Sequence, residues 1–271
     1  MEKDRLLAFQ THVLRWYHRH GRTELPWRNT TNPYKILVSE LMLQQTQVER
    51  VIPKYQAFLN RFPTVASLAK STLAEVLTLW QGLGYNRRAK FLWQAAQKVV
   101  DTRNGIFPTT RTELQKLPGI GPYTASAVST FAFNTPETVI ETNIRSVFIY
   151  HFFPKKRDIS DDEITPLITQ SLYSDNPRLW YAALMDYGAS LKKLLPNPSR
   201  KSRHHTKQSR FEGSPRQVRG EIIRLLTQNT SLTKKQLREK SKGNKQYFEK
   251  ALSDLVSEQL VVKKNISFSL A

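Results

Sequence analysis

Apolar residues recur at spacings of three and four through the first 195 residues of the chain, which gathers them on one face of an α-helix. Two clear runs are Ile36, Leu37, Leu41, Val48 and Ile52, and Leu68, Leu73, Val76, Leu77 and Trp80. Helix-breaking residues separate such runs at Pro63, at Gly82 and Gly84, at Gly105 and Pro108, and at Pro154. No strand-like alternation stands out here, so the pattern predicts an all-α domain at residues 1–195.

A different pattern follows Pro215. It predicts helices at residues 216–226, 233–240 and 246–259, and then two short apolar runs flanking Lys263-Lys264-Asn265, which is a hairpin signal. Together these elements predict a small winged-helix-like α+β module at residues 214–271. The polar and basic segment 196–213, bracketed by prolines, is predicted to be a linker.

The 271-residue chain is strongly basic, because 42 Lys and Arg against 22 Asp and Glu give a net charge of +20. Such an excess indicates a polyanionic partner, first of all nucleic acid. The sequence has no cysteine, which excludes disulfides, thiol catalysis and cysteine-ligated metal centres. His204 and His205 are adjacent but have no further ligands nearby in the sequence, so we expect no metal site.

The chain is charged from Glu2 onward, and nowhere do 18 apolar residues follow one another. We therefore expect no signal peptide, no membrane contact, and a cytoplasmic location at the nucleoid of a bacterium.

The most distinctive local segment is Leu117-Pro-Gly-Ile-Gly-Pro-Tyr-Thr-Ala125. Its two glycines let the backbone approach a ligand closely, and N–H groups at the start of the next helix suit an anion. An ordinary helix–helix turn is the alternative. The charge of the chain favours Gly119 and Gly121 as a clamp for a DNA phosphate.

This segment resembles the helix-hairpin-helix of the DNA glycosylase (HhH-GPD) superfamily, and the nearest resemblance is to the MutY-like adenine glycosylases. The resemblance covers roughly residues 10–190 and rests on further segments in the same order: Pro26-Trp-Arg28, Asn32-Pro-Tyr34, Val38-Ser-Glu-Leu-Met-Leu-Gln-Gln-Thr-Gln-Val48, Trp80-Gln-Gly-Leu-Gly-Tyr85 and Met185-Asp-Tyr-Gly-Ala189. It implies a two-lobed helical domain that hydrolyses the glycosidic bond of adenine mispaired with guanine or 8-oxoguanine, after the base is flipped out.

The resemblance also implies roles for carboxylates. Glu40 matches the acid that protonates adenine, and its apolar helix would raise the pKa of the carboxyl group by desolvation. Glu141 stands where the family has an aspartate that stabilises the cationic sugar and activates water, and Asn143 matches an asparagine that supports this site. Glu40 as a capped structural carboxylate and Glu141 as a solvated helix-end charge are the alternatives.

Other matched positions concern the base and the DNA. Tyr123 replaces the lysine of bifunctional relatives, which implies base removal without strand cleavage; as an alternative it is a core aromatic. Gln45 resembles the glutamine that wedges into the base stack, and Arg28 the arginine that contacts the target base or, alternatively, a phosphate. Asn86 stands where the family often has a tyrosine near the opposite base.

Two family features are missing. MutY-like enzymes usually bind a [4Fe–4S] cluster through four cysteines after the segment matched by 185–189, so this chain resembles the clusterless branch and we expect no cofactor beyond a monovalent cation at the hairpin. The C-terminal part is too short for the usual Nudix-like domain, and it offers Lys245, Lys263 and Lys264 for DNA contact instead. A protein-contact module is the alternative for it.

The expected partner is double-stranded DNA with a mispaired base, bound by a monomer. Two alternatives stay open: a glycosylase for thymine or uracil opposite guanine, favoured by Asn86, and a catalytically weak DNA-binding relative, favoured by Glu141. An RNA-binding module is disfavoured, because aromatic-rich sheet signatures are lacking.

Overall fold

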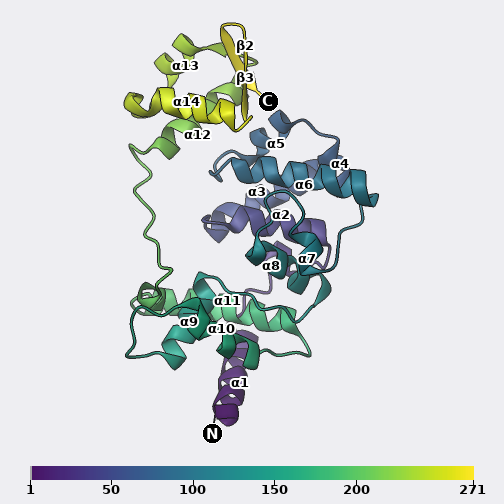
Figure 1. Ribbon diagram of the computed structural model, residues 1–271, viewed down its shortest axis with the longest axis vertical. Coiled ribbons are helices and arrows are strands. Elements are labelled where there is room, and N and C mark those ends of the chain that lie inside the picture. The colour runs from purple at the N-terminus through teal and green to yellow at the C-terminus, as the bar shows by residue number, and fades with distance from the viewer. Residues whose placement is uncertain (1) are drawn as a thin grey trace. The chain divides into compact units, whose positions relative to one another are not determined.

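The computed structural model describes residues 2–271 (Figure 1). These residues divide into two compact units. Unit 1 consists of the chain up to Ile36 with Thr109–Gln115 and Gly121–Lys207, and unit 2 consists of Leu37–Pro108, Lys116–Ile120 and Gln208–Ala271. Each unit is thus assembled from segments far apart in the sequence. The predicted division into residues 1–195, 196–213 and 214–271 stays a prediction.

Unit 1 is helical. Helix α11 packs against α1, α8 and α9, and large apolar side chains such as Phe148, Trp180 and Leu184 are fully buried there. Its elements are α1 (Glu2–His20), η1 (Pro26–Arg28), α7 (Arg111–Leu114), α8 (Pro122–Phe133), α9 (Thr142–Phe152), α10 (Asp161–Gln170), α11 (Pro177–Leu194) and η2 (Pro198–Lys201).

Helix starts in unit 1 are set by side chains that accept hydrogen bonds from first-turn N–H groups. Asn176 accepts from the N–H of Leu179 at the start of α11, and Ser160 forms a capping box with Glu163 at the start of α10. The position of α11 on α9 depends on Gly188, since a Cβ there would lie 2.2 Å from the carbonyl oxygen of Asn143. The packing of α11 against α9 therefore requires the glycine of this motif.

Unit 2 combines a helical part with the C-terminal module. In the helical part, α4 and α5 both pack against α6 (Figure 1). Helix α2 (Pro33–Leu43) begins in unit 1 and continues here, followed by α3 (Val48–Arg61), α4 (Val65–Ala69), α5 (Leu73–Trp80) and α6 (Arg87–Arg103). The predicted helix breaks are confirmed: Pro63 follows α3, Gly82 and Gly84 follow α5, Gly105 and Pro108 follow α6, and Pro154 follows α9.

The C-terminal module is α+β, as predicted. It contains α12 (Pro215–Gln228), β1 (Leu232–Thr233), α13 (Lys234–Lys240), η3 (Lys245–Tyr247), α14 (Phe248–Ser257), β2 (Val261–Lys264) and β3 (Ser267–Leu270). The antiparallel sheet has the order β1-β3-β2, and buried Phe268 of β3 pairs with Leu232 on one side and Lys263 on the other. Its winged-helix character stays a prediction.

Three details of this module differ from the expectation. Lys263 and Lys264 lie in β2 rather than at the tip, because the turn is made by Asn265 and Ile266, with Asn265 at a φ of +53°. The third helix begins only at Phe248, after a 3-10 turn. The short strand β1 was not predicted, since two residues carry no periodicity that a sequence pattern can reveal.

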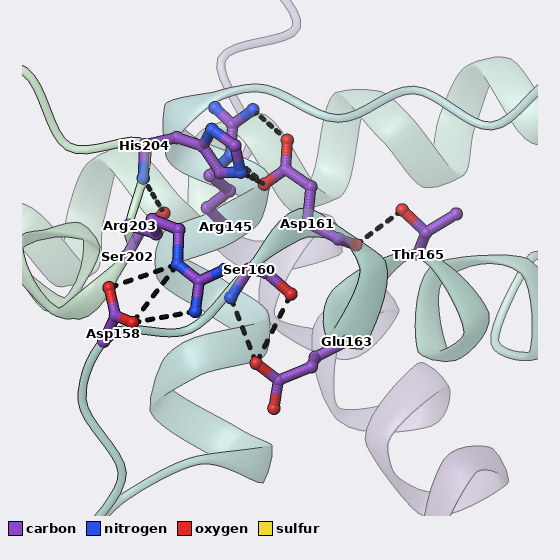
Figure 2. Close-up of polar contacts among 9 residues, drawn as sticks. All are labelled: Arg145, Asp158, Ser160, Asp161, Glu163, Thr165, Ser202, Arg203 and His204. Atoms are coloured by element: carbon purple, nitrogen blue, oxygen red, sulfur yellow. Dashed lines mark hydrogen bonds and ion pairs between the residues drawn. The ribbon is translucent and has the colours of Figure 1, made fainter.

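The segment predicted as a linker begins with ordered contacts. Pro198 and Ser199 of η2 are buried, and Ser202 forms a bridge with Ile159. Figure 2 shows the polar cluster that follows, in which Arg203 pairs with Asp158 at 2.8 Å and His204 lies 3.8 Å from Asp161. From residue 203 to residue 213 every side chain is exposed. Among the described residues, no helix combines the length and the apolar character needed to cross a membrane.

Candidate functional site

The Glu141 carboxylate, in unit 1, forms the N-terminal cap of α9. Its Oε1 accepts hydrogen bonds from the backbone N–H groups of Asn143 at 2.7 Å and Ile144 at 2.9 Å. Its Oε2 accepts from Nδ2 of Asn143 at 3.1 Å. Asn143 therefore lies beside Glu141, whose side chain is folded back onto its own helix. The roles that the resemblance implies for these two residues stay predictions.

Burial raises the pKa of Glu141 above its usual value. The backbone hydrogen bonds and the charges of Lys192 and Arg145 act in the opposite direction, and Arg145 is itself held by Asp161 at 2.6 Å. The side chain of Glu141 is half-buried, not solvated, which disfavours the alternative of a solvated helix-end charge. A fixed, partly desolvated carboxylate at this place is suited to stabilise a developing positive charge.

The motif on α11 contributes a buried carboxylate, Asp186, which is 2% exposed. It accepts hydrogen bonds from the backbone N–H of Arg22 at 2.8 Å, from Nη2 of Arg22 at 2.6 Å and from Nη2 of Arg28 at 3.2 Å. The Arg28 guanidinium also lies 5.7 Å from the centre of the Phe131 ring. With its side chain only 11% exposed, Arg28 is positioned by these contacts and is not an open surface cation.

Glu40 and Tyr123 occupy contrasting places. Glu40 lies in α2 of unit 2 and is 7% exposed, between the buried neighbours Ser39 and Leu41. The proton-donating role expected for this carboxyl group stays a prediction. Tyr123 lies in the first turn of α8 in unit 1 and is half-buried.

The two glycines of the hairpin, Gly119 and Gly121, have different structural roles. Gly119 has a φ of +71°, and a Cβ there would lie 2.4 Å from Cβ of Phe91, so both its conformation and its packing require glycine. Gly121 caps α8 with a φ of −81°, and a Cβ there would meet nothing within 4 Å. Gly121 is exposed, and its missing side chain leaves the first-turn N–H groups of α8 accessible.

Gln45 and Tyr85 are both exposed residues in the left-handed region, with φ values of +54° and +47°. Helix α2 ends at Leu43, and Gln45 stands in the turn that follows it. Non-glycine residues in this conformation are strained and recur at functional sites. Asn86 follows Tyr85, is half-buried, and caps α6 without a side-chain hydrogen bond.

Arg88, to which the sequence analysis assigned no role, holds both of these turns. Its guanidinium donates hydrogen bonds to the carbonyl oxygens of Gln44 at 2.6 Å, Leu83 at 3.0 Å and Gly84 at 3.0 Å, and also to those of Leu41 and Met42. It is 8% exposed, and desolvation lowers its pKa to about 10. In the sequence, Arg88 is visible only as an arginine that directly follows Arg87, and nothing there indicates this role.

The lysines predicted to contact DNA are exposed: Lys245 in η3, and Lys263 and Lys264 in β2. In the part of the chain from residue 2 onward, no group of three or more histidine, cysteine, aspartate or glutamate residues could hold a metal ion.

Known proteins resemble this chain in sequence and in structure. Residues 38–172 match the family model of the HhH-GPD superfamily base excision DNA repair protein. The adenine DNA glycosylase of Buchnera aphidicola is 41% identical over 196 residues, which are 71% of this chain and 55% of that protein. The chain thus spans about half the length of the first curated relatives that it matches.

The adenine DNA glycosylase of Mycolicibacterium smegmatis is matched over more of its length, with 35% identity over 83% of both chains. Among solved structures, a thermostable thymine-DNA glycosylase matches with a TM-score of 0.62 and 25% identity, over 69% of this chain and 87% of that one. These matches show that the chain belongs to the HhH-GPD superfamily, in the family of the adenine DNA glycosylases.

Proposed function

We propose that the protein is a monofunctional adenine DNA glycosylase of base excision repair, acting on adenine mispaired with guanine or 8-oxoguanine. The observation that carries this proposal is the Glu141 site, where one half-buried carboxylate is held by the Asn143 backbone and side chain and faces nearby cations. The membership of the chain in the family of the adenine DNA glycosylases points to the same chemistry.

In the proposed reaction, Glu40 donates a proton to a ring nitrogen of the flipped adenine. The bond between the base and C1′ of the sugar breaks, and its electron pair leaves with the neutral adenine. Glu141 stabilises the cationic sugar and orients the water that attacks C1′, and that water loses its proton to a carboxylate. Tyr123 has no amine to form a Schiff base, so the strand stays intact.

The substrate is a mispaired site in double-stranded DNA, bound by a monomer at the nucleoid in the cytoplasm. Gly119 and the exposed start of α8 bind phosphate, with Gly121 at the first turn. Arg88 fixes the two turns that carry Gln45 and Tyr85, and these two side chains contact the base stack. Arg28, fixed by Asp186, contacts the target base. The net charge of +20 supports a DNA partner.

The iron–sulfur cluster of many relatives does not fit this chain. Its ligands would be thiolates, and the sequence contains no cysteine. Segment 198–204 is held by other means: the buried η2, the Ile159–Ser202 bridge and the Arg203–Asp158 pair. No step of the proposed reaction involves a metal.

The second candidate is removal of thymine or uracil opposite guanine. The likeness to a thymine-DNA glycosylase and the presence of Asn86 beside Tyr85 favour it. The two candidates share the chemistry at the sugar and differ in the base that Glu40 and Arg28 receive.

The test is single-turnover base release from duplexes carrying adenine opposite 8-oxoguanine or guanine, and thymine or uracil opposite guanine, with and without alkali. We expect adenine release that gives strand breaks only after alkali and that is abolished in Glu40→Gln. Glu49→Gln is the matched control, since Glu49 is exposed on the next helix. Release of thymine or uracil alone would establish the second candidate, and no release from any duplex would refute both.

A further inference from the structure

A cavity of about 560 Å³ in unit 2 is formed jointly by the helical part and the C-terminal module. The helical part contributes the Gln44–Gln45 turn and residues 84–88, and the module contributes Arg216 and Arg219 of α12. Volumes of this order hold small organic groups. The module therefore completes a site that begins at the two strained turns.

Arg216 lines this cavity and is held there by aromatic and polar contacts. Its Nη1 donates to the hydroxyl of Tyr85 at 3.1 Å, and its guanidinium lies 5.9 Å from the Tyr85 ring centre and 6.0 Å from that of Phe211. Gln208 donates from Nε2 to the same hydroxyl at 2.6 Å and to Oε1 of Gln45 at 3.2 Å. These contacts connect the module and the segment before it directly to Tyr85 and Gln45.

The chemistry of the cavity suits a nucleotide. Arg87, Arg88, Arg216 and Arg219 supply positive charge, and Glu258 is paired with Arg219 at 2.6 Å. Tyr85 is 40% exposed and offers an aromatic face for a base, and the Gln45 and Asn86 amides offer donors and acceptors. Arginine forks match phosphates and the acceptor edge of guanine.

We propose that Arg216 of the C-terminal module contacts the guanine opposite the excised adenine and determines the opposite-base preference. This inference rests on the proposed function, under which Gln45 enters the stack, so that the nucleotide beside Gln45 is the partner of the adenine. Arginine carries only donors, which match N7 and O6 of guanine. In the structure Nη1 of Arg216 donates to Tyr85 and Nη2 to the Ser209 carbonyl oxygen at 2.6 Å, and each of these nitrogens has a second N–H that guanine can receive. In 8-oxoguanine N7 carries a proton, so Arg216 favours guanine over its oxidised form.

The test measures binding without chemistry, with duplexes in which 2′-fluoro-2′-deoxyadenosine, which resists hydrolysis, stands opposite guanine, 8-oxoguanine or thymine. We expect Arg216→Ala to weaken binding to the guanine duplex by roughly 5- to 150-fold, the range of a lost bidentate contact, and the other duplexes much less. Arg216→Lys keeps the charge but not the fork and should lose most of the same preference.

Arg224→Ala is the matched control, because Arg224 lies on the same helix, pairs with Glu221 at 2.8 Å and does not line the cavity. Equal weakening of all three duplexes by Arg216→Ala would indicate a phosphate contact, and full preference in Arg216→Lys would show that the preference does not depend on the arginine fork. Either result would overturn the proposal. So would tighter binding of free deoxyguanosine monophosphate than of the guanine duplex. If no duplex loses a base in the release assay but Arg216 still sets the preference, only the proposed function fails.

Discussion

At the scale of single residues, Glu141 and Arg88 show how one side chain can organise a site. Glu141 accepts hydrogen bonds from its own helix and carries the charge that the proposed reaction needs. The Arg88 guanidinium is bound mainly by backbone carbonyl oxygens. In both cases the partners are mostly backbone groups, whose positions depend on the fold.

For Glu141 we expect the charge to matter more than the cap. The amide oxygen of Glu141→Gln can still accept from the backbone N–H groups of Asn143 and Ile144, and only the bond from Asn143 Nδ2 is lost, so its thermal unfolding should change little. The single-turnover rate of adenine release should fall by about 100- to 1000-fold, because the stabilising charge is lost. Glu141→Asp keeps the charge and should be much faster than Glu141→Gln. Equal rates in the wild type and Glu141→Gln would contradict this role.

For Arg88 we expect a loss of stability. A lysine cannot donate to the Gln44, Leu83 and Gly84 carbonyl oxygens together, so Arg88→Lys leaves buried acceptors unsatisfied and should lower the free energy of unfolding by roughly 2–4 kcal/mol. Urea denaturation measures it, and Arg87→Lys, at the exposed neighbouring position, is the control. If both variants unfold at the same urea concentration, Arg88 does not hold the turns.

At the scale of elements, the close approach of α11 to α9 places the end of α9 that Glu141 caps. The contact is between Gly188 and the carbonyl group of Asn143, and side-chain bulk at residue 188 would separate the helices. The capping boxes at α4, α5, α10 and α13 define where the other helices begin. The ends of the helices therefore depend on neighbouring residues in the sequence, whereas the positions of the helices depend on contacts between distant parts of the chain.

Gly188→Ala tests this contact. The added Cβ would lie 2.2 Å from the Asn143 oxygen, so we expect a loss of about 1–3 kcal/mol in unfolding free energy together with slower base release. Gly220→Ala in α12 is the control, because a Cβ there meets nothing within 4 Å and alanine favours the helix by roughly 0.5–1 kcal/mol. A melting temperature of Gly188→Ala at or above that of the wild type would refute the packing argument.

At the scale of the whole molecule, the burial of ionisable groups links stability to pH. His151 lies beside His12, and its Nε2 is 3.0 Å from the Tyr187 hydroxyl. Burial, followed by the charges of His12 and Arg5, lowers the pKa of His151 from 6.5 to about 4. The native protein therefore holds His151 neutral where the unfolded chain would protonate it.

This shift sets a pH window. His151 contributes its full stabilisation above pH 6.5, and that contribution is lost as the pH falls from 6.5 to about 4, because the unfolded state binds the proton first. We expect His151→Gln to show a shallower loss of stability over this window in urea denaturation at several pH values. His20→Gln, on the exposed end of α1, should follow the wild type. Parallel curves for all three proteins would exclude His151 as the cause.

The sequence by itself determined the helical first part, the α+β module, the basic charge and the family, because these depend on local periodicity, helix breakers and short motifs. It also pointed to Glu141 and Asn143 as neighbours, two residues apart in the chain. Only the tertiary structure decided that Asp186 holds Arg22 and Arg28, that Arg88 binds two separate turns, and that Arg216 reaches Tyr85. These contacts join residues far apart in the chain, and no local pattern encodes them, because their geometry exists only once helices pack and bury their polar groups together.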